Sequence, residues 1–115
     1  DHSHIDFHPA EFSMDDLLPI QNEINDLIAD GKTVLIQEYP RKTIEEEVEK
    51  DRVDLSRLPS SITKLRTVMI GEKGSIDICP CAGTHVKDIK ELEGLEITKR
   101  KSKGKGKVRI QYRLL

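Results

Sequence analysis

The chain has 115 residues, a net charge of −2, two cysteines, two phenylalanines, two tyrosines and no tryptophan. This length predicts one domain, residues 1–115, with a core that aliphatic side chains must fill. No apolar run is long enough to span a bilayer and no signal-peptide pattern is present, which excludes a membrane protein and predicts a soluble, cytoplasmic one. Two cysteines two positions apart cannot form a disulfide framework.

Charge is distributed unevenly along the sequence. Residues 98–115 contain eight basic side chains and no acidic one, whereas the residues before them contain 11 basic and 21 acidic side chains. A strongly basic segment either binds a polyanion or is simply solvated.

The first part of the chain predicts a strand followed by a helix. Ile5 and Phe7 alternate with polar residues in SHIDFHP, as in a strand. Apolar residues at helical spacing follow, between Ser13, which can form a capping box with a residue three positions on, and Gly31. Pro19 interrupts this pattern, so we expect the regular helix to begin near Leu18, after a turn.

The remaining elements follow at short intervals. TVLIQEY predicts a strand, and TIEEEVEK a short acidic helix with Thr43 and Glu46 as a second capping box. DLSRLPSSI is a loop, KLRTVMIGE and SIDIC form a hairpin around Lys73-Gly74, and HVKDIKELEG forms a short helix. LEITKRK and KVRIQYRLL flank SKGKG as a second hairpin. The prediction is therefore an α+β fold: one compact domain with an antiparallel sheet and two or three helices, ending in a basic β-hairpin.

One short segment, DICPCAGTHV, concentrates reactive side chains. Cys81 and His85 are four positions apart, with Gly83 between them to permit a tight turn. A thiolate and a neutral imidazole are zinc ligands, and zinc takes four such donors. On spacing alone, however, such a pair is more often a buried thiol beside a satisfied surface imidazole.

This segment and the basic hairpin after it resemble the alanyl-tRNA editing family, which comprises free-standing AlaX-type proteins and the editing domain of alanyl-tRNA synthetase. Cys81, Gly83, Thr84 and His85 match its Cys-x-Gly-Thr-His block, with Ala82 where glycine is common. The resemblance implies that Cys81 and His85 bind Zn2+ together with a His-x-x-x-His pair on an earlier helix. It also implies hydrolysis of tRNA(Ala) wrongly charged with serine or glycine.

The other histidines do not complete this ligand set. His4 and His8 have the His-x-x-x-His spacing, but on a strand they would lie about 13 Å apart. We interpret both as surface imidazoles, and expect the helix that carries the other ligands to lie upstream of Asp1. Cys79 has three possible roles: a third ligand, a redox partner of Cys81, or a small core or rim residue. The family's use of only the second cysteine favours the last.

Further side chains are candidates for substrate contacts. The Thr84 hydroxyl could bond a polar substrate side chain or fix the turn, and Asp88 could accept a hydrogen bond from His85. The hairpin is suited to tRNA phosphates, or else protects a sheet edge with solvated lysines. The predicted tRNA-binding residues are Lys99, Arg100, Lys101, Lys103, Lys105, Lys107 and Arg109.

The sequence therefore predicts a zinc-dependent aminoacyl-tRNA deacylase that proofreads translation. Two alternatives stay open for this chain alone. The first is a non-catalytic RNA-binding module with an incomplete metal site, in which Zn2+ is weakly bound or absent. The second is a redox or structural zinc element built on Cys79, Cys81 and His85.

Overall fold

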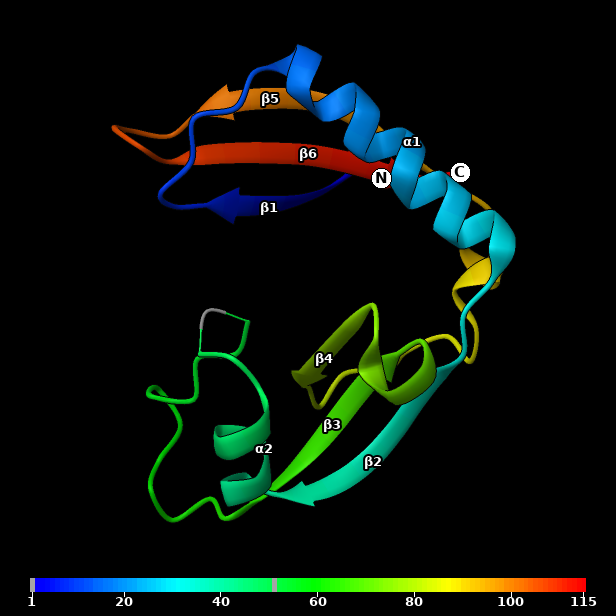
Figure 1. Ribbon diagram of the computed structural model, residues 1–115. Helices are drawn as coiled ribbons and strands as arrows, with labels where there is room; N and C mark the ends of the chain where they lie inside the picture. Colours follow the sequence, from blue (N-terminus) through cyan, green and yellow to red (C-terminus); the bar gives the residue numbers. More distant parts are fainter. Residues whose placement is uncertain (1, 51) are drawn as a thin grey trace. The chain divides into compact units, whose positions relative to one another are not determined.

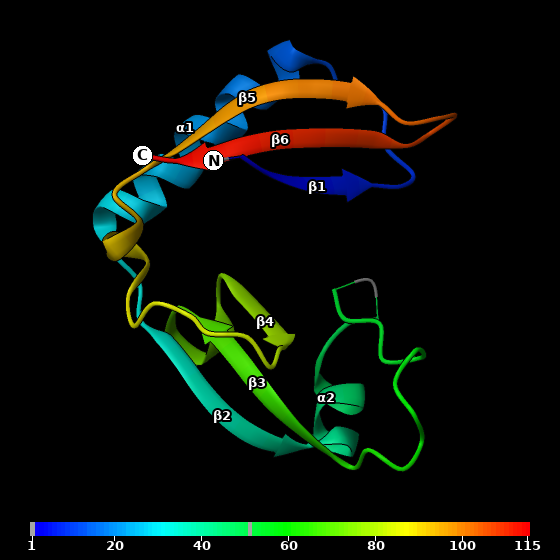
Figure 2. The same ribbon diagram turned by 180° about the vertical axis from the view of Figure 1, so that it is seen from behind.

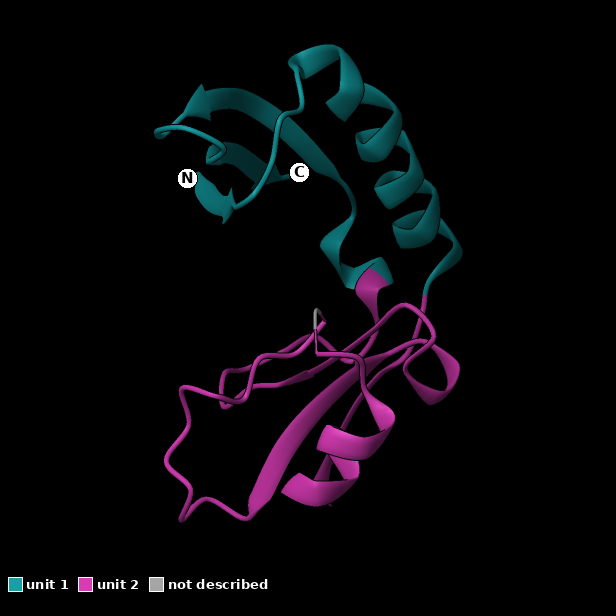
Figure 3. Cartoon of the chain, turned by 60° about the vertical axis from the view of Figure 1, so that its left-hand side comes forward, with its two compact units in different colours: residues 1–31, 90–115 teal, residues 32–89 magenta. Residues whose placement is uncertain are grey.

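The structure, a computed structural model, describes residues 2–50 and 52–115 (Figure 1). Asp1 and Asp51 lie outside the described residues. The predicted α+β class is confirmed, with two α-helices and two three-stranded antiparallel sheets in the described part of the chain. Its contacts divide the chain into two compact units, residues 1–31 with 90–115 and residues 32–89, each with its own sheet (Figure 3). None of the helices in residues 2–50 and 52–115 has the length and apolar character needed to cross a membrane.

The first unit consists of a three-stranded sheet and one long helix. Its strands are β1 (Ser3–Phe7), β5 (Leu95–Ser102) and β6 (Val108–Leu114), in the order β1-β6-β5. Helix α1 (Met14–Asp30) runs beside β5 (Figures 1 and 2). The core of this unit joins the helix to the central strand, and contains Leu17, Val108 and Ile110 with Phe12 and Ile97 packed against them.

Helix α1 begins at Met14, so the predicted start near Leu18 is wrong. The backbone N–H of Ser13 donates to the Asp16 carboxylate at 2.8 Å and its hydroxyl donates to the same oxygen at 3.1 Å, which together lower the pKa of Asp16. This capping interaction fixes the start of the helix. Pro19 is tolerated inside because the one helical bond it cannot make would go to the carbonyl of Asp15, an exposed residue. Gly31 ends the helix as predicted, with a φ of 77°.

Side chains of α1 satisfy the outer edge of β5. The Asn25 amide donates to the Leu95 carbonyl at 2.9 Å and accepts from the Leu95 N–H at 2.8 Å. The Ile97 N–H donates to Gln21 Oε1 at 2.7 Å. An edge strand otherwise exposes unpaired backbone groups. The helix therefore closes this edge with side-chain hydrogen bonds as well as with apolar packing.

We expect Asn25→Ala to lower the free energy of unfolding by about 2–3 kcal/mol, because it removes two hydrogen bonds and leaves the partly buried groups of Leu95 unpaired. Chemical denaturation measures the change. Asn22→Ala, at an exposed position of the same helix, is the matched control and should change stability by less than about 0.5 kcal/mol. Equal losses in the two variants would contradict the role assigned to Asn25.

The second unit places α2 (Arg41–Glu47) beside a second sheet of order β2-β3-β4. Its strands are β2 (Val34–Pro40), β3 (Lys64–Ile70) and β4 (Asp77–Pro80), and the β3–β4 hairpin is confirmed, with the 3-10 turn η1 (Glu72–Gly74) between its strands. The predicted capping box at Thr43 is wrong, since α2 starts at Arg41 directly after β2 and Thr43 lies inside its first turn. The short helix predicted near residue 89 is present as the 3-10 turn η2 (Ile89–Leu92).

The Arg41 side chain organises the long segment between α2 and β3. Its Nε donates to Glu45 at 2.9 Å. The other guanidinium nitrogens donate to the backbone carbonyls of Leu55 (2.9 Å), Leu58 (3.5 Å), Pro59 (2.8 Å) and Ile62 (3.1 Å). The loop predicted here is thus held to the start of α2 by one side chain that is only 16% exposed.

Candidate functional site

The Cys81–His85 segment leaves the sheet of the second unit at the end of β4. In the β3–β4 ladder Val68 pairs with Cys79 and Thr67 with Pro80. The N–H of Cys81 donates to the carbonyl of Arg66 at 3.0 Å, which continues the same register by one step. The sequence between Cys81 and His85 therefore begins from a fixed position opposite β3.

Gly83 links the two candidate metal ligands. Its N–H donates to Cys81 Sγ at 3.4 Å, and its carbonyl lies 3.1 Å from Nδ1 of His85. A Cβ at this position would be 3.6 Å from Cys81 Sγ and 3.9 Å from His85 Cε1. Both side chains therefore lie against the same glycine, as the motif predicts.

The contact with the Gly83 carbonyl bears on the tautomer of His85. A carbonyl oxygen only accepts hydrogen bonds, so in a neutral ring a hydrogen bond at this contact requires the proton on Nδ1, which leaves the lone pair on Nε2 for a metal ion. A metal-binding histidine typically donates its second ring N–H to such an acceptor. A thiol and an imidazole in this state fit a zinc ion. Among residues 2–50 and 52–115 no group of three or more His, Cys, Asp or Glu residues is placed to hold a metal, so the pair provides two donors.

Arg66 was not singled out by the sequence. Its Nη1 donates to the carbonyls of Cys81 and of Gly83, the latter at 3.0 Å. Arg66 is exposed on β3, where an arginine in an alternating strand indicates only a solvated face. No local pattern could reveal these contacts, because the register that places Arg66 beside Cys81 arises only when the strands pair.

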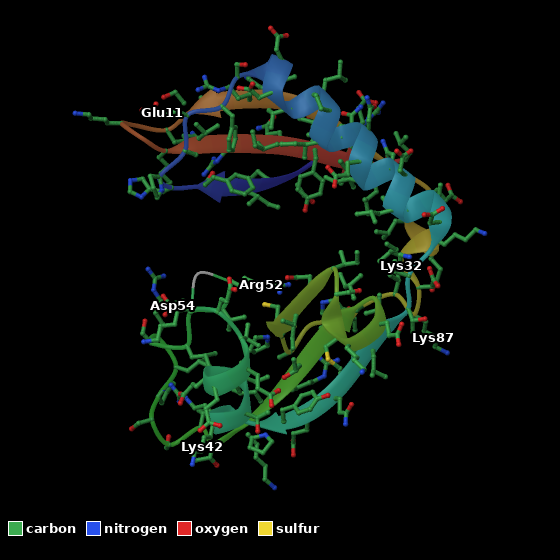
Figure 4. All side chains as sticks on the ribbon, viewed as in Figure 1. Glu11, Lys32, Lys42, Arg52, Asp54 and Lys87 are labelled. Carbon is green, nitrogen blue, oxygen red and sulfur yellow. The ribbon has the colours of Figure 1, made fainter. Side chains whose placement is uncertain are left out.

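A cleft of about 410 Å³ lies beside Cys81 within the second unit. Its walls combine apolar side chains of the loop and of β3 with basic side chains and both cysteines. They include Val53, Leu55, Leu58, Ile62 and Leu65 with Arg52, Lys64, Arg66, Cys79 and Cys81. Figure 4 shows Arg52 and Asp54, two residues of this cleft, on the segment that follows α2. The lining thus offers apolar surface together with basic groups and one carboxylate, that of Asp54.

Cys79 differs from Cys81 in its surroundings. It is exposed on β4, and its Sγ donates to the carbonyl of Pro80 at 3.4 Å. Desolvation raises the pKa of the Cys79 thiol, with further contributions from Asp77 and Cys81. A nucleophilic cysteine requires a thiolate, so a raised pKa disfavours a reactive role for Cys79 in the metal-free chain. This placement is that of a residue on the rim of the sheet.

Thr84 and Asp88 follow in the same segment. Thr84 is exposed beside the candidate ligands, and its proposed contact with substrate stays a prediction. Asp88 Oδ1 accepts the N–H of Lys32 at 3.0 Å, and the Val34 N–H donates to the Lys87 carbonyl at 2.8 Å. Figure 4 shows Lys32 and Lys87 close together, where the chain enters and leaves the second unit. The predicted hydrogen bond from His85 to Asp88 stays a prediction.

Of the two histidines at His-x-x-x-His spacing, His4 lies in a strand, as predicted, and His8 directly follows it. His4 lies in β1 and pairs with Gln111 of β6, and β1 ends at Phe7. The extended backbone between them is the geometry from which we infer that the two imidazoles cannot share one ion.

The predicted basic hairpin is present as β5 and β6, but part of its charge is used within the first unit. Arg109 makes two hydrogen bonds to Asp6, at 2.7 and 3.0 Å, and Lys107 Nζ lies 3.8 Å from the same carboxylate. These contacts, led by the Arg109 hydrogen bond, lower the pKa of Asp6. Arg100 donates to the carbonyl of Phe12 at 2.8 Å. Three of the seven predicted tRNA-binding side chains therefore also stabilise the fold.

The other four, Lys99, Lys101, Lys103 and Lys105, make no ion pair with an acidic residue in the part of the chain that the structure describes. Repulsion from Lys101, followed by Arg109, lowers the pKa of Lys103. The tip between the strands turns at Gly104 and Gly106, both with positive φ. An anion bound here would relieve this repulsion, which is the electrostatic condition for a phosphate contact.

Comparison with known proteins finds one family match and several similar relatives. Residues 65–111 match the family described as Threonyl and Alanyl tRNA synthetase second additional domain. The chain is 32% identical over 116 residues to the alanyl-tRNA editing protein AlaX-M of Methanosarcina barkeri, covering 100% of this chain and 46% of that protein. It is 31% identical over 103 residues to AlaX-L of Pyrococcus horikoshii, covering 90% and 24%. It is 34% identical over 113 residues to the alanine–tRNA ligase of Nitrosopumilus maritimus, covering 97% and 12%. The chain thus spans about half, or less, of the length of these relatives.

Proposed function

Because this chain belongs to the alanyl-tRNA editing family, we propose that it acts in a cytoplasmic deacylase that hydrolyses tRNA(Ala) wrongly charged with serine or glycine. The observation that carries the proposal is the placement of Cys81 and His85 against Gly83. Editing requires cleavage of an ester at the tRNA terminus, and this pair provides two donors for the metal ion that such hydrolysis can use.

Cys81 Sγ and His85 Nε2 are the proposed Zn2+ ligands. The N–H of Gly83 donates to Cys81 Sγ, and the carbonyl of Gly83 is placed to accept from Nδ1, which would leave Nε2 of a neutral ring to bind the ion. When bound, zinc supplies Lewis acidity for ester hydrolysis. The Thr84 hydroxyl is the proposed partner of the polar side chain of a misattached serine. The cleft of about 410 Å³ beside Cys81 is the proposed place for the terminal nucleotide that carries the amino acid.

Deacylation of seryl-tRNA(Ala) by the purified chain tests this function, with alanyl-tRNA(Ala) as the reference substrate and bound zinc measured on the same sample. We expect zinc below one equivalent, because the described residues bring together only two donors, and for the same reason little release of serine after zinc is added, though more than release of alanine. Tight tRNA binding with neither zinc nor turnover would contradict catalysis by this chain. That result would support the alternative, a non-catalytic RNA-binding module, which the two-donor set also allows.

The proposed tRNA contacts make a separate prediction. Replacing Lys101, Lys103, Lys105 and Lys107 together with alanine should weaken tRNA binding. Each lost phosphate contact should reduce the slope of log K against log salt by about 0.7–0.9. Binding titrations at several salt concentrations measure the slope. A variant in which Lys32, Lys42, Lys50 and Lys73 are replaced removes the same charge from the second unit and should change the slope less. Equal changes of the slope in both variants would mean that the hairpin attracts tRNA only through the overall charge of the chain and makes no specific phosphate contacts.

A further inference from the structure

Arg66 is the residue that joins β3 to both ends of the Cys81–Gly83 turn. Its carbonyl accepts the Cys81 N–H at 3.0 Å, and its guanidinium donates to the carbonyls of Cys81 and Gly83. We propose that Arg66 is a positioning residue, which sets the orientation and tautomer of His85 through the carbonyl of Gly83. This proposal rests on the proposed function for the identity of the metal, but the contacts that it uses are present without metal.

The carbonyl oxygen of Gly83 connects Arg66 to the imidazole. It accepts from Arg66 Nη1 at 3.0 Å and lies 3.1 Å from His85 Nδ1, and a carbonyl oxygen has two lone pairs for two donors. Fixing this oxygen with a guanidinium fixes the acceptor of the Nδ1 proton. In the neutral ring the lone pair on Nε2 then has a defined direction, and the Gly83 N–H keeps its contact with Cys81 Sγ at the other side of the same residue.

The position of Arg66 in the sheet suggests a simpler role, an ion pair with a residue of the neighbouring strand, but its contacts differ from this. Arg66 lies directly opposite Glu38 of β2, and oppositely charged residues at such positions commonly form a cross-strand pair. Arg66 makes no ion pair with an acidic residue among residues 2–50 and 52–115. Its guanidinium is directed instead at the two carbonyls of the turn. The side chain thus orders the turn that carries the candidate ligands.

The test compares Arg66→Met, which keeps length and loses all donors, with Arg66→Lys, which keeps charge and a donor. Arg113→Met, which removes an ion-paired arginine of the first unit, is the control. Nitrogen NMR of the metal-free chain reports the His85 tautomer, and titration reports Zn2+ affinity. In Arg66→Met we expect a mixture of both tautomers and a loss of Zn2+ affinity of about 10–100-fold. Arg66→Lys should give intermediate values, and Arg113→Met wild-type values.

Each outcome decides the proposal. A folded Arg66→Met variant with the wild-type tautomer would overturn it, as would a change of the same size in Arg113→Met. If Arg66→Met does not fold, Arg66→Lys decides by the same readout: a shift towards the other tautomer supports positioning, and no shift overturns it. If the wild-type chain binds no Zn2+, the proposed zinc site fails, whereas the tautomer comparison in the metal-free chain still decides the role of Arg66.

Discussion

Cys81→Ala is expected to lower the Zn2+ affinity of the chain by about 100-fold or more, and to abolish any release of serine from seryl-tRNA(Ala). Four donors in a zinc site together provide about 10–16 kcal/mol, so one donor corresponds to about 3 kcal/mol, or slightly more than 100-fold. His85→Ala removes the second donor and should have an effect of similar size. Isothermal titration with Zn2+, and deacylation assays on the same preparations, measure both effects.

Cys79→Ala is the matched control for this prediction. The two cysteines are two positions apart and both line the cleft, but only Cys81 Sγ is contacted by Gly83, and the pKa of the Cys79 thiol is raised. We therefore expect Cys79→Ala to leave Zn2+ affinity and serine release unchanged. If it lowers both as much as Cys81→Ala, the ion is held by the two cysteines together, and the structural or redox alternative replaces the editing site.

The strands could be predicted because alternation of apolar and polar residues is local. The starts of the two helices could not, because several local signals compete there. In α1 the hydrogen bonds between Ser13 and Asp16 outweigh the cost of Pro19, so the helix begins one turn earlier than the proline suggests. In α2 the pairing of β2 with β3 extends to Pro40, so the helix begins at the next residue and the Thr43 signal has no effect.

The candidate site shows the same division. That Cys81 and His85 lie close together could be predicted, because they share one turn with Gly83. Arg66 could not, because its contacts lie 15 and 17 residues away and depend on strand register. The basic tip could be located from composition. The sequence could not show which of its basic side chains are already paired, because the partner of Arg109 is Asp6, 103 residues away.

Arg41→Ala is expected to lower the free energy of unfolding by about 3–5 kcal/mol. Hydrogen bonds from a charged donor contribute about 1.5–3 kcal/mol each, and several of the carbonyls that Arg41 contacts would lose their partner. Solvent can reach the exposed carbonyls of the loop and recover part of this energy, which keeps the expected loss below the sum of the individual bonds. Denaturant titration measures the stability of the variant.

Lys42→Ala is the matched control at the next position of α2 (Figure 4). The Lys42 side chain is 83% exposed and its ammonium lies 3.9 Å from Glu46, a surface pair that contributes at most about 0.5 kcal/mol. Hydrogen exchange should also show faster exchange in residues 55–62 in Arg41→Ala and no change in Lys42→Ala. A loss below about 1 kcal/mol in Arg41→Ala would mean that apolar packing, and not the guanidinium, holds the loop. Because Leu55, Leu58 and Ile62 line the cleft beside Cys81, loosening this loop should weaken substrate binding while leaving Zn2+ affinity unchanged.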